Sequence, residues 1–203
     1  NGVAEGVLRL TLSRGQSARG LSPAGASQPT LLITQSALPE DLASRWHSGY
    51  RLVRTPWRKP APDMLPAWAK HGNYLGAILA LRAAQEAGAD DALLCTHDGL
   101  AAEATTSNLF FLIDGQLHTP DLTSGALPGI LRAAVLECAG ALGLPTVQGP
   151  IDEAAWTRAS EVFLTNAVRG LMPVAAIDDQ TYAVPGRLTQ QLATDVLHAT
   201  EKQ

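Results

Sequence analysis

The sequence predicts an α+β fold. Strand-like and helix-like segments are mixed, without the regular β–α–β alternation of a doubly wound parallel sheet. Two Asp-Gly pairs, at 98–99 and 114–115, lie between β-rich runs and predict hairpins of antiparallel strands. With 203 residues and 46% hydrophobic content, the chain can bury a core of ordinary size.

The first third of the chain is predicted to form three strands. Segment 7–12 alternates between apolar and polar residues, and apolar runs at 30–37 and 50–56 predict two further strands. A Gly-rich loop, 13–27, separates the first two strands. The four prolines between residues 56 and 66 are typical of a linker or a surface loop.

Helices and hairpins make up the rest of the chain. A helical pattern over 74–87 ends at Gly88, which suits a helix C-terminus. The later predicted elements are hairpins at 92–104 and 108–119, a helix at 127–145 that opens with Pro-Gly, buried strands at 161–167 and 173–177, and an amphipathic helix at 185–200.

Composition and charge argue against several classes of partner. The net charge is −4 and the 15 Lys and Arg residues are scattered, which argues against a nucleic-acid or membrane-surface partner. No apolar run is long enough to span a membrane. Cys95 and Cys138 lie far apart, outside any Cys/His cluster, so we expect two buried free thiols in a reducing cytoplasm and no metal site.

Lys70 stands immediately before the predicted helix, followed by three hydrogen-bonding residues, His71, Asn73 and Tyr74. An exposed lysine with its ammonium in solvent is one interpretation. Apolar surroundings would instead disfavour a charged amine, and a neutral amine can attack a carbonyl carbon. Lys70 is therefore a candidate for a Schiff-base lysine.

Glu103 is a lone carboxylate in an otherwise uncharged predicted strand. It could lie on the solvent face of its hairpin. If it is buried, it needs a positive partner, and a protonated pyridine nitrogen would serve.

Two further segments could hold a phosphate. The residues from Gly129 to Leu131 open a helix, where free backbone N–H groups favour an anion. A buried strand ends in Thr165 and Asn166, a second small polar cluster. Either feature alone could be an ordinary helix start or strand-end loop.

Taken in order, four segments resemble the class IV (fold type IV) pyridoxal-phosphate enzymes. These segments are AKHGNYL, AGADDALLCTHDGLAAEATTSNLFFLIDGQLHTP, LPGILR and EVFLTNAVRGLMPV. The family includes branched-chain and D-amino-acid aminotransferases and aminodeoxychorismate lyase. The resemblance implies a large pseudo-barrel domain, bound pyridoxal 5′-phosphate and a homodimer.

The resemblance also implies roles for individual residues. Lys70 would bond covalently to the cofactor and then move the substrate proton, while Glu103 would pair with the pyridine N–H. The implied phosphate ligands are Ile130, Leu131, Asn166 and Ala167. Leu131 and Ala167 stand where the family often has hydroxyl side chains, so only backbone donors are expected there.

The loop LSRGQSARGLS, residues 12–22, bears on which reaction is catalysed. Aminodeoxychorismate lyases carry a similar stretch, in which the second arginine, here Arg19, meets a substrate carboxylate. Leu21 replaces a histidine of the D-amino-acid aminotransferases. Tyr74 favours the opposite conclusion, because the lyases usually have arginine there. The prediction is a lyase that releases 4-aminobenzoate and pyruvate, with Arg19 and Tyr74 at the substrate. An aminotransferase and a non-catalytic binding protein are the alternatives.

The resemblance divides the chain into two parts. Residues 1–37 would be the end of a small N-terminal domain, and residues 38–203 the large cofactor-binding domain. We expect a further N-terminal segment upstream of Asn1 that carries the family's phosphate-binding arginine. The expected partner is a small carboxylate substrate, and the expected location is the cytoplasm.

Overall fold

The computed structural model describes residues 5–200, and the chain divides into two compact units between Glu40 and Asp41. The first unit is a two-stranded antiparallel ribbon of β1 (Val7–Leu12) and β2 (Leu31–Ser36). Both predicted strands are confirmed. Residues 13–30 form the long connection between them, so Arg19 and Leu21 lie in this loop.

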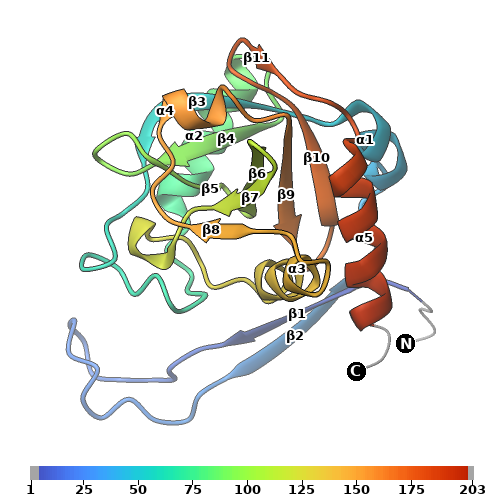
Figure 1. Ribbon diagram of the computed structural model, residues 1–203. Helices are drawn as coiled ribbons and strands as arrows, with labels where there is room; N and C mark the ends of the chain where they lie inside the picture. Colours follow the sequence, from blue (N-terminus) through green and yellow to red (C-terminus); the bar gives the residue numbers. More distant parts are fainter. Residues whose placement is uncertain (1–4, 201–203) are drawn as a thin grey trace. The chain divides into compact units, whose positions relative to one another are not determined.

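The second unit is built on one nine-stranded mixed sheet that curls strongly (Figure 1). Its strand order is β5-β4-β3-β10-β9-β6-β7-β8, with β11 paired to β10. The strands are β3 (Tyr50–Arg58), β4 (Asp91–Cys95), β5 (Ala101–Ala104), β6 (Asn108–Ile113), β7 (Gln116–Thr119), β8 (Thr146–Gln148), β9 (Glu161–Asn166), β10 (Gly170–Ile177) and β11 (Gln180–Thr181). The predicted α+β class is confirmed, since parallel and antiparallel pairs share this sheet.

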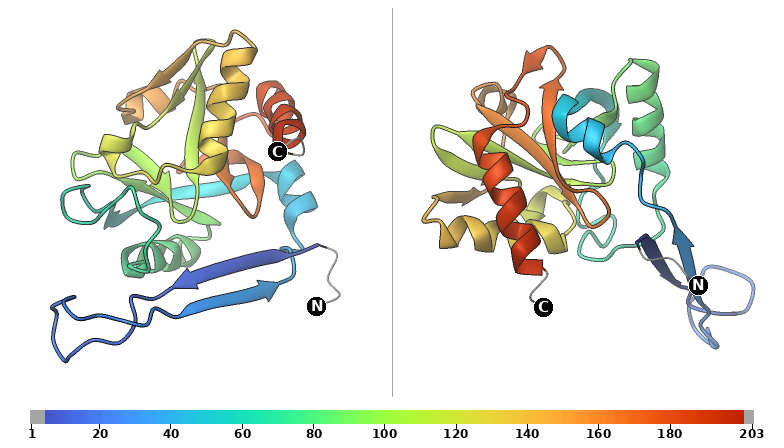
Figure 2. Two further views of the ribbon diagram at one scale, coloured as in Figure 1. Left: turned by 90° about the horizontal axis from the view of Figure 1, so that it is seen from below. Right: turned by 90° about the vertical axis from the view of Figure 1, so that its right-hand side faces the viewer.

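Helices lie around the curled sheet, and Trp156 of the shortest one packs into the core inside the curl. They are α1 (Leu42–Ser48), α2 (Leu75–Glu86), α3 (Ile130–Ala141), α4 (Glu153–Trp156) and α5 (Arg187–Thr200), with a 3-10 turn at Leu122–Ser124. Helix α2 packs on β3 and β4, while α3 and α5 lie side by side against β9 (Figure 2). Within residues 5–200, no helix is both long and apolar enough to cross a bilayer.

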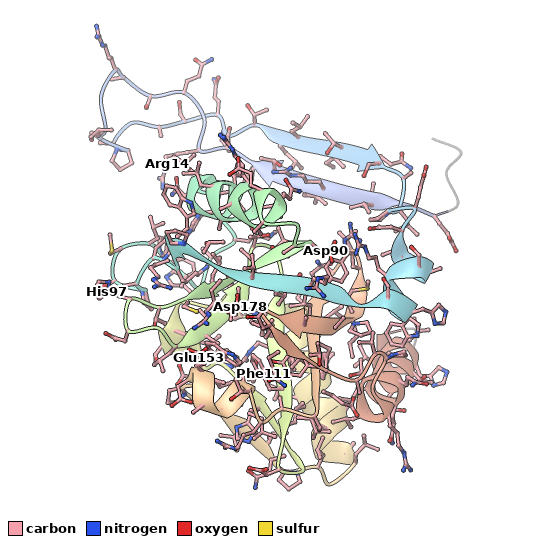
Figure 3. The ribbon with its side chains drawn as sticks, turned by 90° about the horizontal axis from the view of Figure 1, so that it is seen from above. Arg14, Asp90, His97, Phe111, Glu153 and Asp178 are labelled. Carbon is pink, nitrogen blue, oxygen red and sulfur yellow. The ribbon has the colours of Figure 1, made fainter. Side chains whose placement is uncertain are left out.

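Strand β6 shows why several strands are apolar without alternation. Leu109 and Phe111 belong to the core inside the curl, where Figure 3 labels Phe111. Phe110 points the other way and stacks on Phe163 beneath α3 and α5, with ring centroids 5.0 Å apart. A strand buried on both faces reads as a continuous apolar run.

Ion pairs fix shorter elements onto this sheet. Arg54 on β3 donates to both carboxylate oxygens of Glu153 on α4, at 2.7 and 2.9 Å. Its Nε donates to Asp178 in the turn after β10. Figure 3 labels both acidic residues. Arg54 thereby holds α4 and the β10–β11 turn to the central strand β3.

The sequence predicted the long elements and missed the short ones. The hairpin of β6 and β7 turns at Asp114 and Gly115, both with positive φ, as its Asp-Gly pair predicted. Helices α1 and α4, strands β8 and β11 and the 3-10 turn were not predicted. Helices of four and seven residues show too few turns for a periodic pattern, and strands of two and three residues show too little alternation. Cys95 is buried as expected, but Cys138, on the flank of α3, is only half-buried.

Candidate active site

A cavity of about 380 Å³ opens in the second unit beside the start of α2. Its lining includes Lys70 and Tyr74 from the segment that enters α2, and Glu103 from β5. These three residues were predicted as site residues, and the structure brings them together. Lys59, Ser107 and Asn108 also line the cavity, and sequence reasoning did not assign them to the site.

Lys70 lies at the end of the proline-rich loop, five residues before Leu75, where α2 begins. Its Nζ donates a 2.7 Å hydrogen bond to the hydroxyl of Tyr74 and lies 5.2 Å from the centre of that ring. The apolar enclosure expected around this amine is not found, because the side chain is exposed at the mouth of the cavity. Tyr74 instead supplies a polar contact that orients it.

Glu103 is buried, so the solvent-face interpretation of its hairpin position is wrong. Strand β5 is buried along its whole length, and Glu103 itself is 8% exposed. Its Oε2 accepts a 2.9 Å bond from the backbone N–H of Leu127, and its Oε1 pairs with the ammonium of Lys59. The positive partner that a buried carboxylate requires is thus supplied by the chain itself.

The start of α3 lies close against β6. A Cβ on Gly129, the N-cap of α3, would stand 2.1 Å from Oδ1 of Asn108, so only glycine fits there. The amide of Asn108 donates to the carbonyl of Leu127 at 2.8 Å. The N–H groups of Ile130 and Leu131 fall in the first turn, where no partner exists within the helix. Such a helix start can bind an anion.

The β9–β10 turn reaches the same region. Asn166 donates from Nδ2 to the hydroxyl of Ser107 at 2.9 Å. Its Oδ1 accepts from the backbone N–H groups of Val168 and Arg169, at 3.0 and 2.8 Å. The side chain therefore holds the turn in place, and one of its two amide hydrogens is already used. The pairing of Asn108 with Thr165 brings this turn beside the start of α3.

Asp91 fixes the loop between β5 and β6 through hydrogen bonds to Thr105. Its Oδ1 accepts from the hydroxyl and the backbone N–H of Thr105, at 2.6 and 3.3 Å. Burial raises the pKa of this carboxyl above its usual value, against the lowering effect of those hydrogen bonds. Because Thr105 and Ser107 line the cavity, Asp91 supports its wall.

Arg19 belongs to the loop of the first unit, whereas the cavity lies wholly within the second. Its predicted contact with a substrate carboxylate stays a prediction.

The second unit is thus a curled mixed sheet with a lysine amine and a buried carboxylate in one cavity. Residues 1–177 match the family described as Amino-transferase class IV. The chain belongs to this family, as its four sequence segments predicted.

Among curated relatives, the chain is 31% identical over 178 residues to a putative branched-chain-amino-acid aminotransferase of Methanocaldococcus jannaschii. That match covers 88% of this chain and 61% of the relative. The chain thus spans about three fifths of that protein's length.

Two solved structures are also similar. The 4-amino-4-deoxychorismate lyase of Pseudomonas aeruginosa superimposes with a TM-score of 0.87 and 32% identity, over 96% of this chain and 71% of the lyase. The T.th. branched-chain amino acid aminotransferase with pyridoxamine 5′-phosphate has a TM-score of 0.86 and 29% identity, over 95% of this chain and 64% of that one. The predicted fold is confirmed by both.

Proposed function

We propose that this protein is a pyridoxal-phosphate-dependent lyase that converts 4-amino-4-deoxychorismate into 4-aminobenzoate and pyruvate, a step of folate biosynthesis. The observation that carries the cofactor assignment is the shared cavity of Lys70 and Glu103. Its wall at Asn108 contacts Leu127 and Gly129, which lead into α3. Pyridoxal phosphate has an aldehyde, a pyridine nitrogen and a phosphate. The lysine amine of the cavity matches the aldehyde, the buried carboxylate matches the pyridine nitrogen, and the anion-binding helix start matches the phosphate.

The residues present fit this cofactor. Glu103 would accept a hydrogen bond from the pyridine N–H, and the backbone N–H groups of Ile130 and Leu131 would bind the phosphate at the α3 terminus. The turn at Asn166 and Ala167 supplies further donors to the phosphate. When bound, the cofactor acts as the electron sink for the carbanion that deprotonation produces.

Lys70 binds the cofactor covalently and then acts as the base. It would remove the proton at C4 of the substrate, and the carbon–oxygen bond to the enolpyruvyl group would then break. The leaving group would take up a proton and become pyruvate, while the ring becomes aromatic. Tyr74 orients the amine through the hydrogen bond already present. Arg19 binds a substrate carboxylate, a role supported by the similarity of its loop to that of the lyases.

The comparison with the lyase supports this choice. Its identity of 32% and its coverage of 71% exceed the values of 29% and 64% for the aminotransferase with pyridoxamine 5′-phosphate. We further propose a homodimer in the cytoplasm.

An aminotransferase acting on branched-chain or D-amino acids is the second candidate. Tyr74 favours it, since the lyases usually have arginine at this place. The name of the Methanocaldococcus relative also supports it. In this case Lys70 would both remove and return a proton, and the product released would be a keto acid.

Product analysis distinguishes the two candidates. Cofactor-loaded protein is incubated with aminodeoxychorismate and, separately, with D- and L-amino acids plus 2-oxoglutarate. The proposal predicts stoichiometric 4-aminobenzoate and pyruvate from the first mixture and only slow transamination in the others. Fast conversion of D-alanine or a branched-chain amino acid, with no pyruvate from aminodeoxychorismate, would establish the aminotransferase instead.

A further inference from the structure

Two lysines line the candidate cavity, and their environments differ. The side chain of Lys59 is 19% exposed and forms an ion pair with Glu103, whose side chain is 10% exposed. The amine of Lys70 is exposed and donates to the uncharged hydroxyl of Tyr74. Among residues 5–200, Lys70 forms no ion pair with a carboxylate.

We propose that Glu103 determines which lysine takes up the cofactor, by holding Lys59 as a paired ammonium and leaving Lys70 free to react. This proposal rests on the proposed cofactor site. It gives Glu103 a selecting role in addition to its contact with the pyridine ring, and it makes Lys59 a residue that must be kept from reacting.

The chemistry of the bond explains the selection. A lysine nitrogen donates its lone pair to the aldehyde carbon, forming a carbon–nitrogen bond. The nitrogen then loses its two protons, and the aldehyde oxygen leaves as water. An ammonium has no lone pair, so a lysine engaged as a charged donor cannot begin this step. The hydroxyl of Tyr74 carries no charge, so its hydrogen bond with Lys70 does not require an ammonium there.

The geometry keeps Glu103 in this position. Its Oε2 is held by the backbone N–H of Leu127, so the carboxylate cannot rotate freely and Oε1 is left for Lys59. Glu103 is also the one acidic side chain, among the described residues, that lines this cavity. Removing its charge leaves Lys59 with no other carboxylate in the cavity.

The first test uses cofactor-free protein and measures how fast each lysine is acetylated by acetic anhydride, mapped by mass spectrometry. The chain has only three lysines, the third being Lys202, so the sites are readily resolved. Glu103→Gln is expected to speed acetylation of Lys59 by roughly tenfold and to leave Lys70 unchanged. Asp91→Asn is the matched control, because it removes a buried carboxylate that bonds Thr105 and not a lysine, and it should change neither rate.

The second test adds pyridoxal phosphate and traps the adduct with borohydride, in Lys70→Ala and in the double variant Lys70→Ala/Glu103→Gln. The proposal predicts no adduct at Lys59 in the single variant and a clear one in the double variant. Circular dichroism confirms that each variant is folded. If Glu103→Gln does not fold, Glu103→Asp, which retracts the carboxylate by one methylene, should give a smaller increase in Lys59 reactivity.

Any of three results would overturn the selection. They are equal labelling of Lys59 in the two variants, labelling of Lys59 in neither variant, and an acetylation rate of Lys59 that Glu103→Gln leaves unchanged. The proposed function fails in a different way, by the absence of any adduct at Lys70 in the unmodified protein. In that case the acetylation rates still decide whether Glu103 restrains Lys59.

Discussion

Glu103 illustrates how a single residue can combine burial with charge. A carboxylate that is 8% exposed requires compensation, and here a backbone N–H and the Lys59 ammonium provide it. Its position inside the cavity means that any group with a pyridine N–H would meet a fixed acceptor. The residue is therefore expected to matter for both cofactor binding and turnover.

We expect Glu103→Gln to lower turnover by about two decades. The neutral amide no longer holds the pyridine protonated, and loss of a charged buried partner costs ~2–3 kcal/mol. Steady-state kinetics with saturating cofactor measure the effect, and circular dichroism confirms the fold. Turnover close to that of the unmodified protein would remove Glu103 from the chemistry.

Asp91 should produce a distinct pH dependence of stability. Burial raises the pKa of its carboxyl in the folded state above the value in the unfolded chain. The folded state therefore holds this proton more tightly, and stability falls as pH rises from about 4 through the folded pKa. The free energy of unfolding of the protein should fall relative to that of Asp91→Asn over this range, as measured by urea denaturation. A difference that stays constant from pH 3 to about 7 would contradict this origin of the pKa shift.

At the scale of elements, the contact between α3 and β6 shapes the proposed phosphate site. Gly129 allows the helix start to approach Asn108, and no side chain caps that terminus. The free N–H groups of the first turn therefore depend on one glycine for their position.

Gly129→Ala should weaken binding of pyridoxal phosphate and lower the melting temperature, since its Cβ would stand 2.1 Å from Oδ1 of Asn108. Gly140→Ala is the matched control, because that glycine lies in the same helix with nothing within 4 Å of its Cβ. The control should leave the free energy of unfolding unchanged or raise it by about 0.4–1 kcal/mol. Equilibrium dialysis and thermal denaturation measure the two effects, and equal losses in both variants would show that the close approach is unimportant.

Elements also show where sequence reasoning succeeds. The Asp-Gly hairpins and the helices of twelve or more residues were predictable, because their signals lie within a few neighbouring residues. An acid alone in an uncharged strand left the burial of Glu103 open, and the structure shows the buried position. The pairing of Glu103 with Lys59 was not predictable, because the two residues are 44 positions apart and meet only through the pairing of β3, β4 and β5. The contact of Asn166 with Ser107, 59 positions apart, was missed for the same reason.

At the scale of the whole molecule, the second unit contains the lysine, the carboxylate and the helix start that the proposed chemistry needs. Of the two residues that bear on the proposed substrate, Tyr74 lines the cavity of the second unit, whereas Arg19 belongs to the first unit.

The most direct measurement is the identification of the lysine that bonds to the cofactor. The protein is incubated with pyridoxal phosphate, reduced with borohydride, digested and mapped by mass spectrometry. We predict a single phosphopyridoxyl group on Lys70, which Lys70→Ala abolishes. A modification on Lys59 in the unmodified protein, or on neither of these lysines, would contradict the account.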